Sequence, residues 1–459
     1  DEPATIQGEV EGERDESIKH YRLDDGSFVA VQYAEPVHYK TSDGQWQEID
    51  NTLTLENDEY VSENGSVTKR FAKDLGSGRL FEVSFGEYSL SMSAVSPDGG
   101  AMPPSGEGEI GVPIAPELTS EASVENPERQ SVKGLEPSSL PSPALLTSEI
   151  SYIGAYNGAD LVYENHGYNI KESIVVKQPQ SSYTYAFGMS AKGLEAELTE
   201  AGAVELKNEA GQVIFEIPAP YMVDANGETS TDARYILAES DEGYILGLTA
   251  SSDWMNDDAR AYPVTIDPSV YLHYKSSDLR VACIRKNSPN SKSPADGGIV
   301  CGTNPSSNYG ECQVAIQVET LPYIPENCVI VNAQMMVYYA GLSANVYDSS
   351  NGKILANAYR LNGVSSNLEN LTWNGVYGSG GLGRDSIVLD YNTFTKGKLQ
   401  SYVSWDITNA AKQWYNSYSQ KGGIILVSQN DASKNEWASL GGHKNGGIRP
   451  YFIVNYRHT

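Results

Sequence analysis

Short segments in which apolar and polar residues alternate recur along most of the chain, with polar turns between them. A period of two places the apolar side chains on one face of a β-strand. Short strands spaced about 8–12 residues apart are typical of β-sandwiches and barrels. The chain is therefore predicted to be all-β. The clearest of these segments are 27–33, 45–49, 80–85, 88–92, 159–164, 170–176, 183–187, 203–206, 213–217, 235–237 and 244–248.

One segment of the C-terminal third has the period of an α-helix instead. Apolar residues recur there at the i, i+3, i+4 and i+7 positions that form one face of a helix, and Asp406 or Thr408 can cap the first turn. We expect this helix around residues 408–418, at one end of a jelly-roll sandwich. The apolar positions are Ile407, Ala410, Ala411, Trp414, Tyr415 and Tyr418.

Acidic and basic residues are divided unevenly along the chain. The 459 residues carry a formal net charge of −28. Residues 269–459 hold 12 acidic and 16 basic side chains, whereas residues 1–268 hold 48 acidic and 16 basic ones. The negative field argues against nucleic acid and anionic lipid as partners of the whole molecule, since both are polyanions. This exclusion weakens for the mildly basic C-terminal third.

Nine prolines between residues 95 and 147 interrupt the strand pattern. Ser, Gly and Glu surround them, and such a composition buries too little apolar surface to offset the entropy of ordering. We predict a flexible linker or inserted loop there. The predicted organisation is an acidic leader over 1–20, a first part of an N-terminal β region over 21–92, the Pro-rich insertion over 93–147, the second part of that β region over 148–268, and a jelly-roll sandwich over 269–459.

Two β-sandwich or jelly-roll units are thus expected, joined through a β region that carries the Pro-rich insertion. The alternative is that residues 21–92 and 148–268 form two small separate domains. The first of these pieces is marginal as an independent unit, because a small domain buries little of its surface.

The sequence offers little support for catalysis or for a bound cofactor. The six histidines are scattered without metal-ligand spacing, and no zinc-protease, serine-hydrolase or P-loop motif occurs. We therefore expect no enzyme and no cofactor. Because no run of roughly 18 apolar residues occurs, we expect no membrane insertion. The turns at 224–228 and 348–352 contain Asp and Asn residues that could ligate structural calcium, although an ordinary turn is favoured.

Four cysteines lie close together in the sequence: Cys283, Cys301, Cys312 and Cys328. None forms a Cys-x-x-Cys pair, which argues against a zinc or redox site. An even number within one β domain predicts two disulfides and an oxidising compartment. Three pairings are open. We favour Cys283–Cys301, which would close the polar loop over 284–300, and Cys312–Cys328, which would tie two successive strands. Four buried free thiols are the alternative.

Tryptophan is concentrated in the C-terminal third, which contains four of the six tryptophans. Most aromatic rings pack in β cores. Exposed rings, however, can stack on sugar faces while Lys and Arg bind carboxylate or phosphate groups. An anionic glycan is therefore a candidate ligand. The candidate binding residues are Tyr309, Trp437, Arg384, Lys434 and Arg449, of which Arg449, before Pro450, can equally be structural.

Two sets of short motifs occur in order along the chain. The first set is YAEPVHY at 33–39, DGQWQEIDNTL at 43–53, KESIVV at 171–176, IPAPYM at 217–222 and YPVTIDP at 262–268. It resembles the N-terminal region of Gram-positive wall-associated RHS/YD-repeat proteins. The second set is NYG at 308–310, LTWN at 371–374, WDIT at 405–408 leading to Trp414, GGIIL at 422–426 and RPYFIVNY at 449–456. It resembles the DNRLRE-type β-sandwich, which is similar to carbohydrate-binding modules.

This resemblance implies an extracellular protein, secreted or associated with the cell wall, whose modules precede a long YD-repeat shell that often carries a C-terminal toxin. The sequence given contains no YD repeats and no toxin domain. We therefore expect a fragment or an unusual member, with the downstream YD-repeat shell of a larger parent protein as a partner. A toxin-delivery role is not carried over.

Several classes of function are compatible with these observations. The favoured hypothesis is a non-catalytic module that binds glycan or an anionic wall polymer through the C-terminal sandwich. The alternative is a purely architectural stalk or plug segment of an RHS/YD-repeat surface protein. A polysaccharide-active enzyme and a host-protein adhesin are the minor alternatives. An exposed aromatic patch would favour binding, whereas wholly buried tryptophans would favour architecture.

Overall fold

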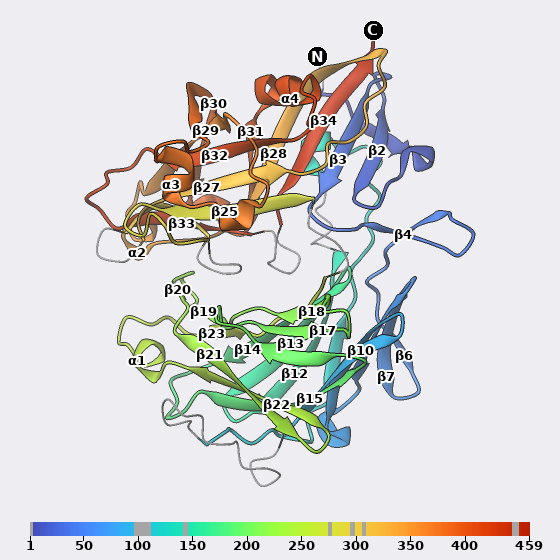
Figure 1. Cartoon of the computed structure of the whole chain (residues 1–459), viewed down its shortest axis with the longest axis vertical. Helices are drawn as coiled ribbons and strands as arrows, with labels where there is room; N and C mark the ends of the chain where they lie inside the picture. The colour runs from blue at the N-terminus through green and yellow to red at the C-terminus, as the bar shows by residue number, and fades with distance from the viewer. Residues whose placement is uncertain are drawn as a thin grey trace.

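The computed structural model describes residues 3–95, 112–140, 146–273, 278–293, 299–304, 309–442 and 449–459. Strands form most of this part of the chain, which confirms the all-β prediction. The molecule has two halves, one above the other in Figure 1. We call the lower half, built from strands between residues 54 and 272, the N-terminal sandwich. The upper half, built from strands within 6–33 and 279–458, is the C-terminal sandwich.

The N-terminal sandwich consists mainly of two antiparallel sheets packed face to face. Phe71 and Phe81 of one sheet lie against Tyr163 of the other, with ring centroids 5.7 and 5.3 Å apart. Alternating apolar residues on the facing strands form one continuous core, as the period-two pattern predicts.

The two sheets differ in size, and a smaller sheet lies beside them. The eight-stranded sheet has the order β21 (Ala233–Ser240), β22 (Gly243–Ala250), β15 (Thr184–Lys192), β10 (Tyr88–Ala94), β9 (Arg79–Phe85), β8 (Val67–Ala72), β7 (Glu59–Asn64) and β6 (Thr54–Glu56). The seven-stranded sheet has the order β11 (Ala122–Glu125), β12 (Ser148–Tyr156), β13 (Ala159–His166), β14 (Asn169–Val176), β23 (Val264–Asp267), β19 (Tyr221–Val223) and β20 (Thr229–Ser230). The four-stranded sheet comprises β16 (Glu195–Leu198), β17 (Val204–Lys207), β18 (Val213–Ile217) and β24 (Tyr271–Leu272).

The C-terminal sandwich is one 13-stranded antiparallel sheet that curls around its own core. Strands far apart in the sheet order face each other across this core: the Trp405 indole donates to the Ala356 carbonyl at 3.1 Å, and the rings of Tyr339 and Phe394 lie 5.0 Å apart. The order is β1 (Ile6–Glu9), β2 (Ile18–Leu23), β3 (Phe28–Tyr33), β34 (Tyr451–His458), β28 (Cys328–Leu342), β33 (Glu436–Leu440), β26 (Val300–Asn304), β27 (Gly310–Val318), β32 (Gly422–Ser428), β29 (Lys353–Leu361) and β30 (Arg384–Thr395), while β25 (Leu279–Arg285) pairs with β27 and β31 (Ser401–Asp406) with β28.

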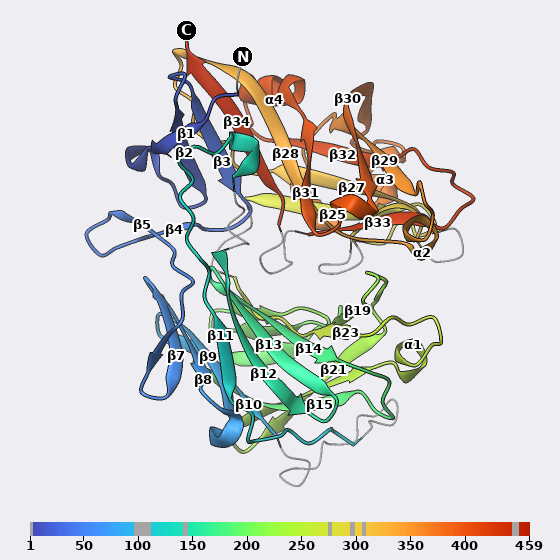
Figure 2. The ribbon, with the colours of Figure 1, turned by 180° about the vertical axis from the view of Figure 1, so that it is seen from behind.

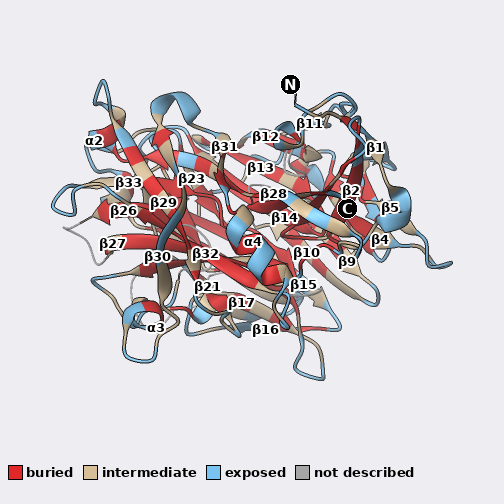
Figure 3. Cartoon of the chain, turned by 90° about the horizontal axis from the view of Figure 1, so that it is seen from above, coloured by how far each residue is buried: buried red, intermediate tan, exposed pale blue. Residues whose placement is uncertain are grey.

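The predicted helix is confirmed as α4 (Thr408–Tyr415). It buries Ala410, Ala411 and Trp414 against the sheet and leaves other positions exposed (Figure 3). The Asp406 carboxylate accepts a hydrogen bond from the Thr408 amide at 2.9 Å, so it binds one of the free amides of the first turn. Three shorter helices were not predicted: α1 (Ser252–Met255), α2 (Ala344–Tyr347) and α3 (Trp373–Tyr377).

The first three strands belong to the C-terminal sheet, so assigning 1–20 to a solvated leader and 21–33 to the N-terminal β region was wrong. β3 pairs with β34 from Phe28↔Tyr456 to Tyr33↔Tyr451. It is buried on both faces, with Val31 in one core and Ala30 in another. The sequence pattern indicates a strand here, but it does not indicate which distant strand is its partner. Similarly, residues 271–272 form β24 and pair with β18, so the N-terminal sandwich extends beyond residue 268.

The described part of the Pro-rich segment is ordered against both sandwiches, contrary to the expected flexible linker. β11 extends the N-terminal sandwich, and the chain then rises to the C-terminal sandwich (Figure 2). There the Ile6 amide donates to the Leu135 carbonyl at 2.8 Å, and Leu140, after the short turn η4 (Pro137–Ser139), is buried over the N-terminal strands. We call residues 126–140 the strap. Residues 96–111 and 141–145 lie outside the described residues.

Two further features connect the two sandwiches, besides the strap. The hairpin of β4 (His38–Lys40) and β5 (Trp46–Glu48) connects the two sandwiches in sequence. Close backbone packing occurs at a further point, because a Cβ on Gly227 would lie 2.9 Å from the Cα of Gly341. Since Gly227 also has a φ of +83°, glycine suits this position on both counts.

All four cysteines are free, so the two expected disulfides were wrong. Cys283, Cys301 and Cys312 are buried together in the core of the C-terminal sandwich, whereas Cys328 lies half-buried at the start of β28. Cys312 thus lies in the core while its expected partner Cys328 lies near His458 at the edge. Small apolar thiols simply pack in this core.

Leu140 is the strap residue that tests this packing. Leu140→Ala removes a buried side chain and is expected to lower the free energy of unfolding by about 2 kcal/mol or more. Leu118→Ala, on the same Pro-rich segment but 45% exposed, is the matched control with an expected change below about 0.5 kcal/mol. Denaturant titration of the full chain measures both. Equal small effects would contradict an ordered strap.

The free thiols give a second prediction. Protein purified without reductant and then unfolded in the presence of a thiol-reactive chromophore should titrate four thiols per chain, because no cysteine pair is bonded. In the folded protein Cys328 should react first, since it is the least buried. Two thiols or none in the unfolded chain would instead support the disulfide prediction.

Candidate functional site

The five candidate glycan-binding residues lie at four separate places. Arg449 is buried between the two sandwiches, where its guanidinium contacts the Glu35 carboxylate at 3.2 Å. Lys434 lies in the turn after Asp431, and Arg384 begins β30. Tyr309 and Trp437 line one small cavity. The structure therefore does not bring these residues together into one site.

The cavity beside Tyr309 and Trp437 is too small to hold a sugar ring. Its volume is about 50 Å³, which is close to that of one or two water molecules. Trp437 is only 7% exposed, and its indole donates to the Asn435 side chain at 3.1 Å. The Arg285 guanidinium lies 5.1 Å from the Tyr309 ring. Both rings are thus held by the protein itself.

Arg384, by contrast, belongs to a cluster of rings and charges on the outer face of the C-terminal sheet. Its guanidinium lies 3.7 Å from the Tyr359 ring centroid and donates to the Tyr377 hydroxyl at 3.2 Å. The Tyr377 and Trp373 rings are 4.9 Å apart. The Lys286 ammonium lies 5.7 Å from the Trp373 ring centroid. We call Trp373, Tyr377, Arg384, Lys286 and Gln313 the aromatic patch.

Hydrogen bonds between polar side chains fix the geometry of the aromatic patch. The Tyr377 hydroxyl donates to Gln313 at 2.5 Å, and Gln313 in turn donates to Glu311 at 2.9 Å. The other carboxylate oxygen of Glu311 accepts from Lys286 at 3.1 Å. Burial raises the pKa of Tyr377 above its usual value, so the hydroxyl keeps its proton and acts as a donor. The contacts form a closed ring around the rim of the two aromatic side chains.

The local fold explains why these rings lie at the surface. α3 begins at Trp373 because the Thr372 hydroxyl caps it, accepting from the Gly375 amide at 3.0 Å. Leu371 and Val376 anchor this segment in an apolar cluster on the outer face of the sheet. Trp373 packs against that cluster only in part, and Tyr377 is 39% exposed. A ring pair supported from below and open above can stack on a sugar face, while Arg384 and Lys286 supply charge for an anionic group.

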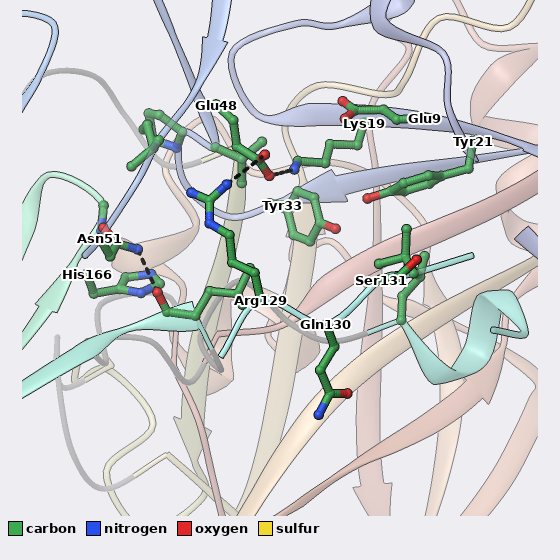
Figure 4. Close-up of a pocket in the computed structure, with 17 residues that line it drawn as sticks. Glu9, Lys19, Tyr21, Tyr33, Glu48, Asn51, Arg129, Gln130, Ser131 and His166 are labelled. Atoms are coloured by element: carbon green, nitrogen blue, oxygen red, sulfur yellow. Dashed lines mark hydrogen bonds and ion pairs between the residues drawn. The ribbon is translucent and has the colours of Figure 1, made fainter. Parts of the chain in front are cut away.

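A larger cavity lies between the strap and the first strands (Figure 4). Its volume is about 360 Å³, within the range of small-molecule sites. In Figure 4 Lys19, Glu48 and Arg129 approach one another on one side, Tyr21 and Tyr33 line another, and Asn51 lies beside His166. The strap contributes Arg129, Gln130 and Ser131 to the lining, and the cavity is therefore closed on one side by the segment expected to be flexible.

The charged groups of this cavity are engaged with one another. Lys19 forms an ion pair with Glu48, and Arg129 of the strap contacts Asp50 at 3.1 Å. Burial alone would raise the pKa of Glu9, but hydrogen bonds from His38 and Arg14 outweigh it and bring that pKa to about 2. These pairs fasten the strap and the β4–β5 hairpin to the sheet, and we assign the cavity to the connection between the halves.

A buried polar cluster joins the two sandwiches next to this cavity. Glu35 contacts Arg449 of the C-terminal sandwich and bonds His166 of the N-terminal sandwich. Asn169 also donates to Glu35, at 3.2 Å. Burial lowers the pKa of His166 to about 4, with a partial opposing effect from Glu35. Arg449 therefore has the structural role that its position before Pro450 allowed.

The turn at 224–228, one of the two considered for calcium, has hydrogen-bond partners within the protein. The Asp224 carboxylate accepts from the Arg260 guanidinium at 3.0 Å and from the amides of Asn226 and Glu228 at 2.9 Å, as in an ordinary turn. Among the residues that the structure describes, no group of three or more His, Cys, Asp or Glu side chains could hold a metal ion. No helix of the described ranges is long and apolar enough to cross a membrane.

Trp373, Tyr377 and Lys286 were not among the predicted binding residues. Trp373 was not singled out in the sequence, because most aromatic rings pack in β cores. The signal that could have found it is the Thr-Trp-Asn-Gly sequence itself, since Thr372 can cap a short helix that turns the chain out of the sheet.

Comparison with known proteins gives distant relatives. No protein-family model matches the chain. The chain is 26% identical, over 466 aligned residues, to the tRNA nuclease WapA of Bacillus subtilis strain 168, an alignment covering 98% of this chain and 18% of that protein. It is also 26% identical, over 224 aligned residues, to a wall-associated protein of Geobacillus stearothermophilus, covering 48% of this chain and 76% of that protein. The chain thus spans about a fifth of the length of the nucleases that it matches.

The solved structures add no argument about the fold. The N-terminal domain of a Streptococcus gordonii adhesin aligns over 96% of this chain and 86% of that domain, but at 9% identity and a TM-score of 0.15.

The low pKa of His166 predicts acid sensitivity. The unfolded chain protonates His166 near its ordinary pKa of about 6.5, whereas the folded chain does so only near 4. The contribution of His166 to the free energy of unfolding should therefore be lost as the pH is lowered from about 6.5 toward 4, and be fully present above that window. His20, whose pKa burial also lowers to about 4, contributes in the same sense.

His166→Asn should reduce the loss of stability over that pH window, because one of the two histidines whose pKa burial lowers no longer titrates. His458→Asn, at the exposed end of β34, is the matched control and should retain the wild-type dependence. Denaturant titrations at several pH values measure both. An unchanged pH dependence of stability in His166→Asn would contradict the role given to His166 in the buried polar cluster.

Proposed function

We propose that this chain is a non-catalytic, cell-wall-associated module of an extracellular protein, and that it binds an anionic glycan or wall polymer through the aromatic patch. The single observation that carries the proposal is the Trp373–Tyr377 ring pair with Arg384 and Lys286 at its rim. Rings bind the apolar faces of sugars, and the two cations pair with carboxylate or phosphate groups.

The electrostatic setting supports an anionic rather than a neutral ligand. The C-terminal third carries more basic than acidic residues, whereas the rest of the chain is strongly acidic. The C-terminal sandwich also includes the acidic strands within 6–33, so it is near neutral overall. An anionic polymer would be repelled by the strongly acidic N-terminal sandwich and much less by the C-terminal one. Glu311 engages Lys286 from the side of the sheet, which leaves Lys286 side-chain atoms 57% exposed for a ligand.

The relatives support the location. A wall-associated protein of Geobacillus stearothermophilus and WapA proteins of Bacillus are similar to this chain. Their alignment is the basis for proposing a wall-associated, extracellular role. The finer proposal is that the chain comes from an RHS/YD-repeat protein, with a YD-repeat shell as partner, and that its C-terminal sandwich is of the DNRLRE type. The sequence motifs described above support this finer proposal.

The nuclease activity in the relatives' names is not assigned to this chain. Only about a fifth of the length of those proteins aligns with it. We propose that the aligned region acts in binding or assembly.

A purely architectural role is the second candidate, and one observation favours it. Trp405, Trp414 and Trp437 are all at most 7% exposed, so three of the four C-terminal tryptophans serve the core. Trp373 differs from them because it is only half-buried. Whether the aromatic patch binds a ligand therefore distinguishes the binding role from the architectural role.

Substitution within the aromatic patch tests the proposal. Trp373→Ala and Arg384→Ala should each weaken binding of the full chain to purified teichoic acid or polyuronate by about tenfold or more, as expected for aromatic and arginine contacts at the centre of an interface. Tyr418→Ala removes a fully exposed tyrosine after α4 and is the matched control. Calorimetric titration at low salt measures all three.

Far-UV circular dichroism checks that each variant is folded. If the wild-type chain binds none of these polymers, the proposal fails and the architectural role stands. If it binds and all three variants bind equally, the ligand site lies elsewhere and the patch is not the site.

A further inference from the structure

A lysine occupies a core position of the N-terminal sandwich. In β8 the buried positions Val67, Lys69 and Phe71 alternate with less buried ones, so these three side chains share the inward face. Lys69 is 1% exposed. Lysine is almost never fully buried without a partner, because desolvating its charge is costly. This position therefore requires an explanation.

The facing strand carries an amide at the matching position. In β13 Tyr163 and Asn165 point inward, and Asn165 is fully buried. The Phe71 ring lies 5.7 Å from the Tyr163 ring, and two residues along each strand Lys69 meets Asn165. The Phe71–Tyr163 pair and the Lys69–Asn165 pair are thus successive contacts across the sandwich. The packing of the two sheets therefore holds the lysine and the asparagine opposite each other.

The contact between the two side chains is direct. The Lys69 ammonium nitrogen lies 2.7 Å from Asn165 Oδ1, and also 2.7 Å from the carbonyl oxygens of Gly167 and Asn169. The Asn165 Nδ2 donates to the Asn51 carbonyl at 2.8 Å, which fixes the orientation of the carboxamide. Lys69 has no ion-pair partner among the described residues; Glu35, whose charge acts on it, pairs instead with Arg449 and His166.

The amine can be neutral at physiological pH. Burial lowers the pKa of Lys69 to about 7, and the charge of Glu35 opposes this only in part. A neutral amine carries the lone pair needed for nucleophilic attack on a carbonyl carbon. Lys69 Nζ is held at hydrogen-bond distance from Asn165 Oδ1, one bond from the Cγ that it would attack. Groups held close together in a dry core react far faster than the same groups in solution.

We propose that Lys69 and Asn165 react to form an intramolecular amide bond between the two sheets. The Lys69 Nζ attacks the Asn165 Cγ, a new C–N bond forms, and the bond from Cγ to Nδ2 breaks. The Nζ proton passes to Nδ2, which leaves as ammonia. An amine and a carboxamide thus give a secondary amide and ammonia, and no oxidant or reductant is needed.

The product removes a buried group that is costly to keep. The amine can no longer ionise in the core, so its desolvation penalty disappears. The new bond also joins β8 to β13 across 96 residues of chain, which constrains the unfolded state as a disulfide over a similar loop does. The N-terminal sandwich, which holds no disulfide, would thereby gain a covalent link between its two sheets.

Mass spectrometry of the wild-type full chain after denaturation tests the proposal. The intact mass should be lower than the sequence mass by one ammonia, and a protease digest should contain one branched peptide in which Lys69 is joined to Asn165. Succinimide formation at an Asn–Gly step also loses ammonia, so the branched peptide decides between the two. An unmodified Lys69 peptide as the sole form, or ammonia loss located elsewhere, would overturn the proposal.

Two variants provide a further check. Lys69→Arg keeps the charge but cannot form the amide, and Asn165→Ala removes the electrophile; each should show the full sequence mass and a lower temperature of unfolding. Lys73→Arg, on an exposed lysine that follows β8, is the matched control and should still lose one ammonia. Ammonia loss at wild-type level in Lys69→Arg would contradict the assignment of Lys69, even if Asn165→Ala fails to fold.

Discussion

The pairing of β3 with β34 is the constraint on which the rest of this architecture depends. It places the beginning and the end of the chain in adjacent strands, with Tyr33 opposite Tyr451. Continued by two residues, the same register brings Glu35 to Arg449, which it contacts at 3.2 Å. Glu35 then bonds His166 of the other sandwich, and the strap covers the apolar face of β3. One strand pair thus completes the C-terminal sheet and positions the buried polar cluster between the two sandwiches.

Much of the local structure follows from the sequence, because period-two alternation and the apolar face of residues 407–418 are properties of neighbouring residues. The partner of β3 is not such a property: its residues are equally compatible with any sheet that offers an edge. The strap was missed for a related reason. Its composition is poor in apolar residues, yet a few anchors such as Leu140 and a set of backbone hydrogen bonds suffice to hold it on a surface that is already folded.

The candidate sites likewise depend on tertiary packing that the sequence does not indicate. Of the predicted binding residues Arg384 alone lies in the aromatic patch, because the other four were chosen by residue type and their surroundings depend on tertiary packing. Trp373 was not among the predicted binding residues, although a cap at Thr372 turns it outward. No sequence pattern indicates that Lys69 is buried, because a single lysine within a strand normally faces solvent. Only the register across the sandwich shows that it faces Asn165 instead.

We propose that the aromatic patch on the C-terminal sandwich binds an anionic sugar polymer, with its rings and its cations acting together. The most direct measurement is a titration of the full chain with a polyuronate and with the same polymer after its carboxylates have been reduced, each at low and high salt. We expect the polyuronate to bind more tightly than the reduced polymer, and we expect salt to narrow this difference in affinity because it screens Arg384 and Lys286. Equal affinity for both polymers at low salt, or binding of neither, would contradict it.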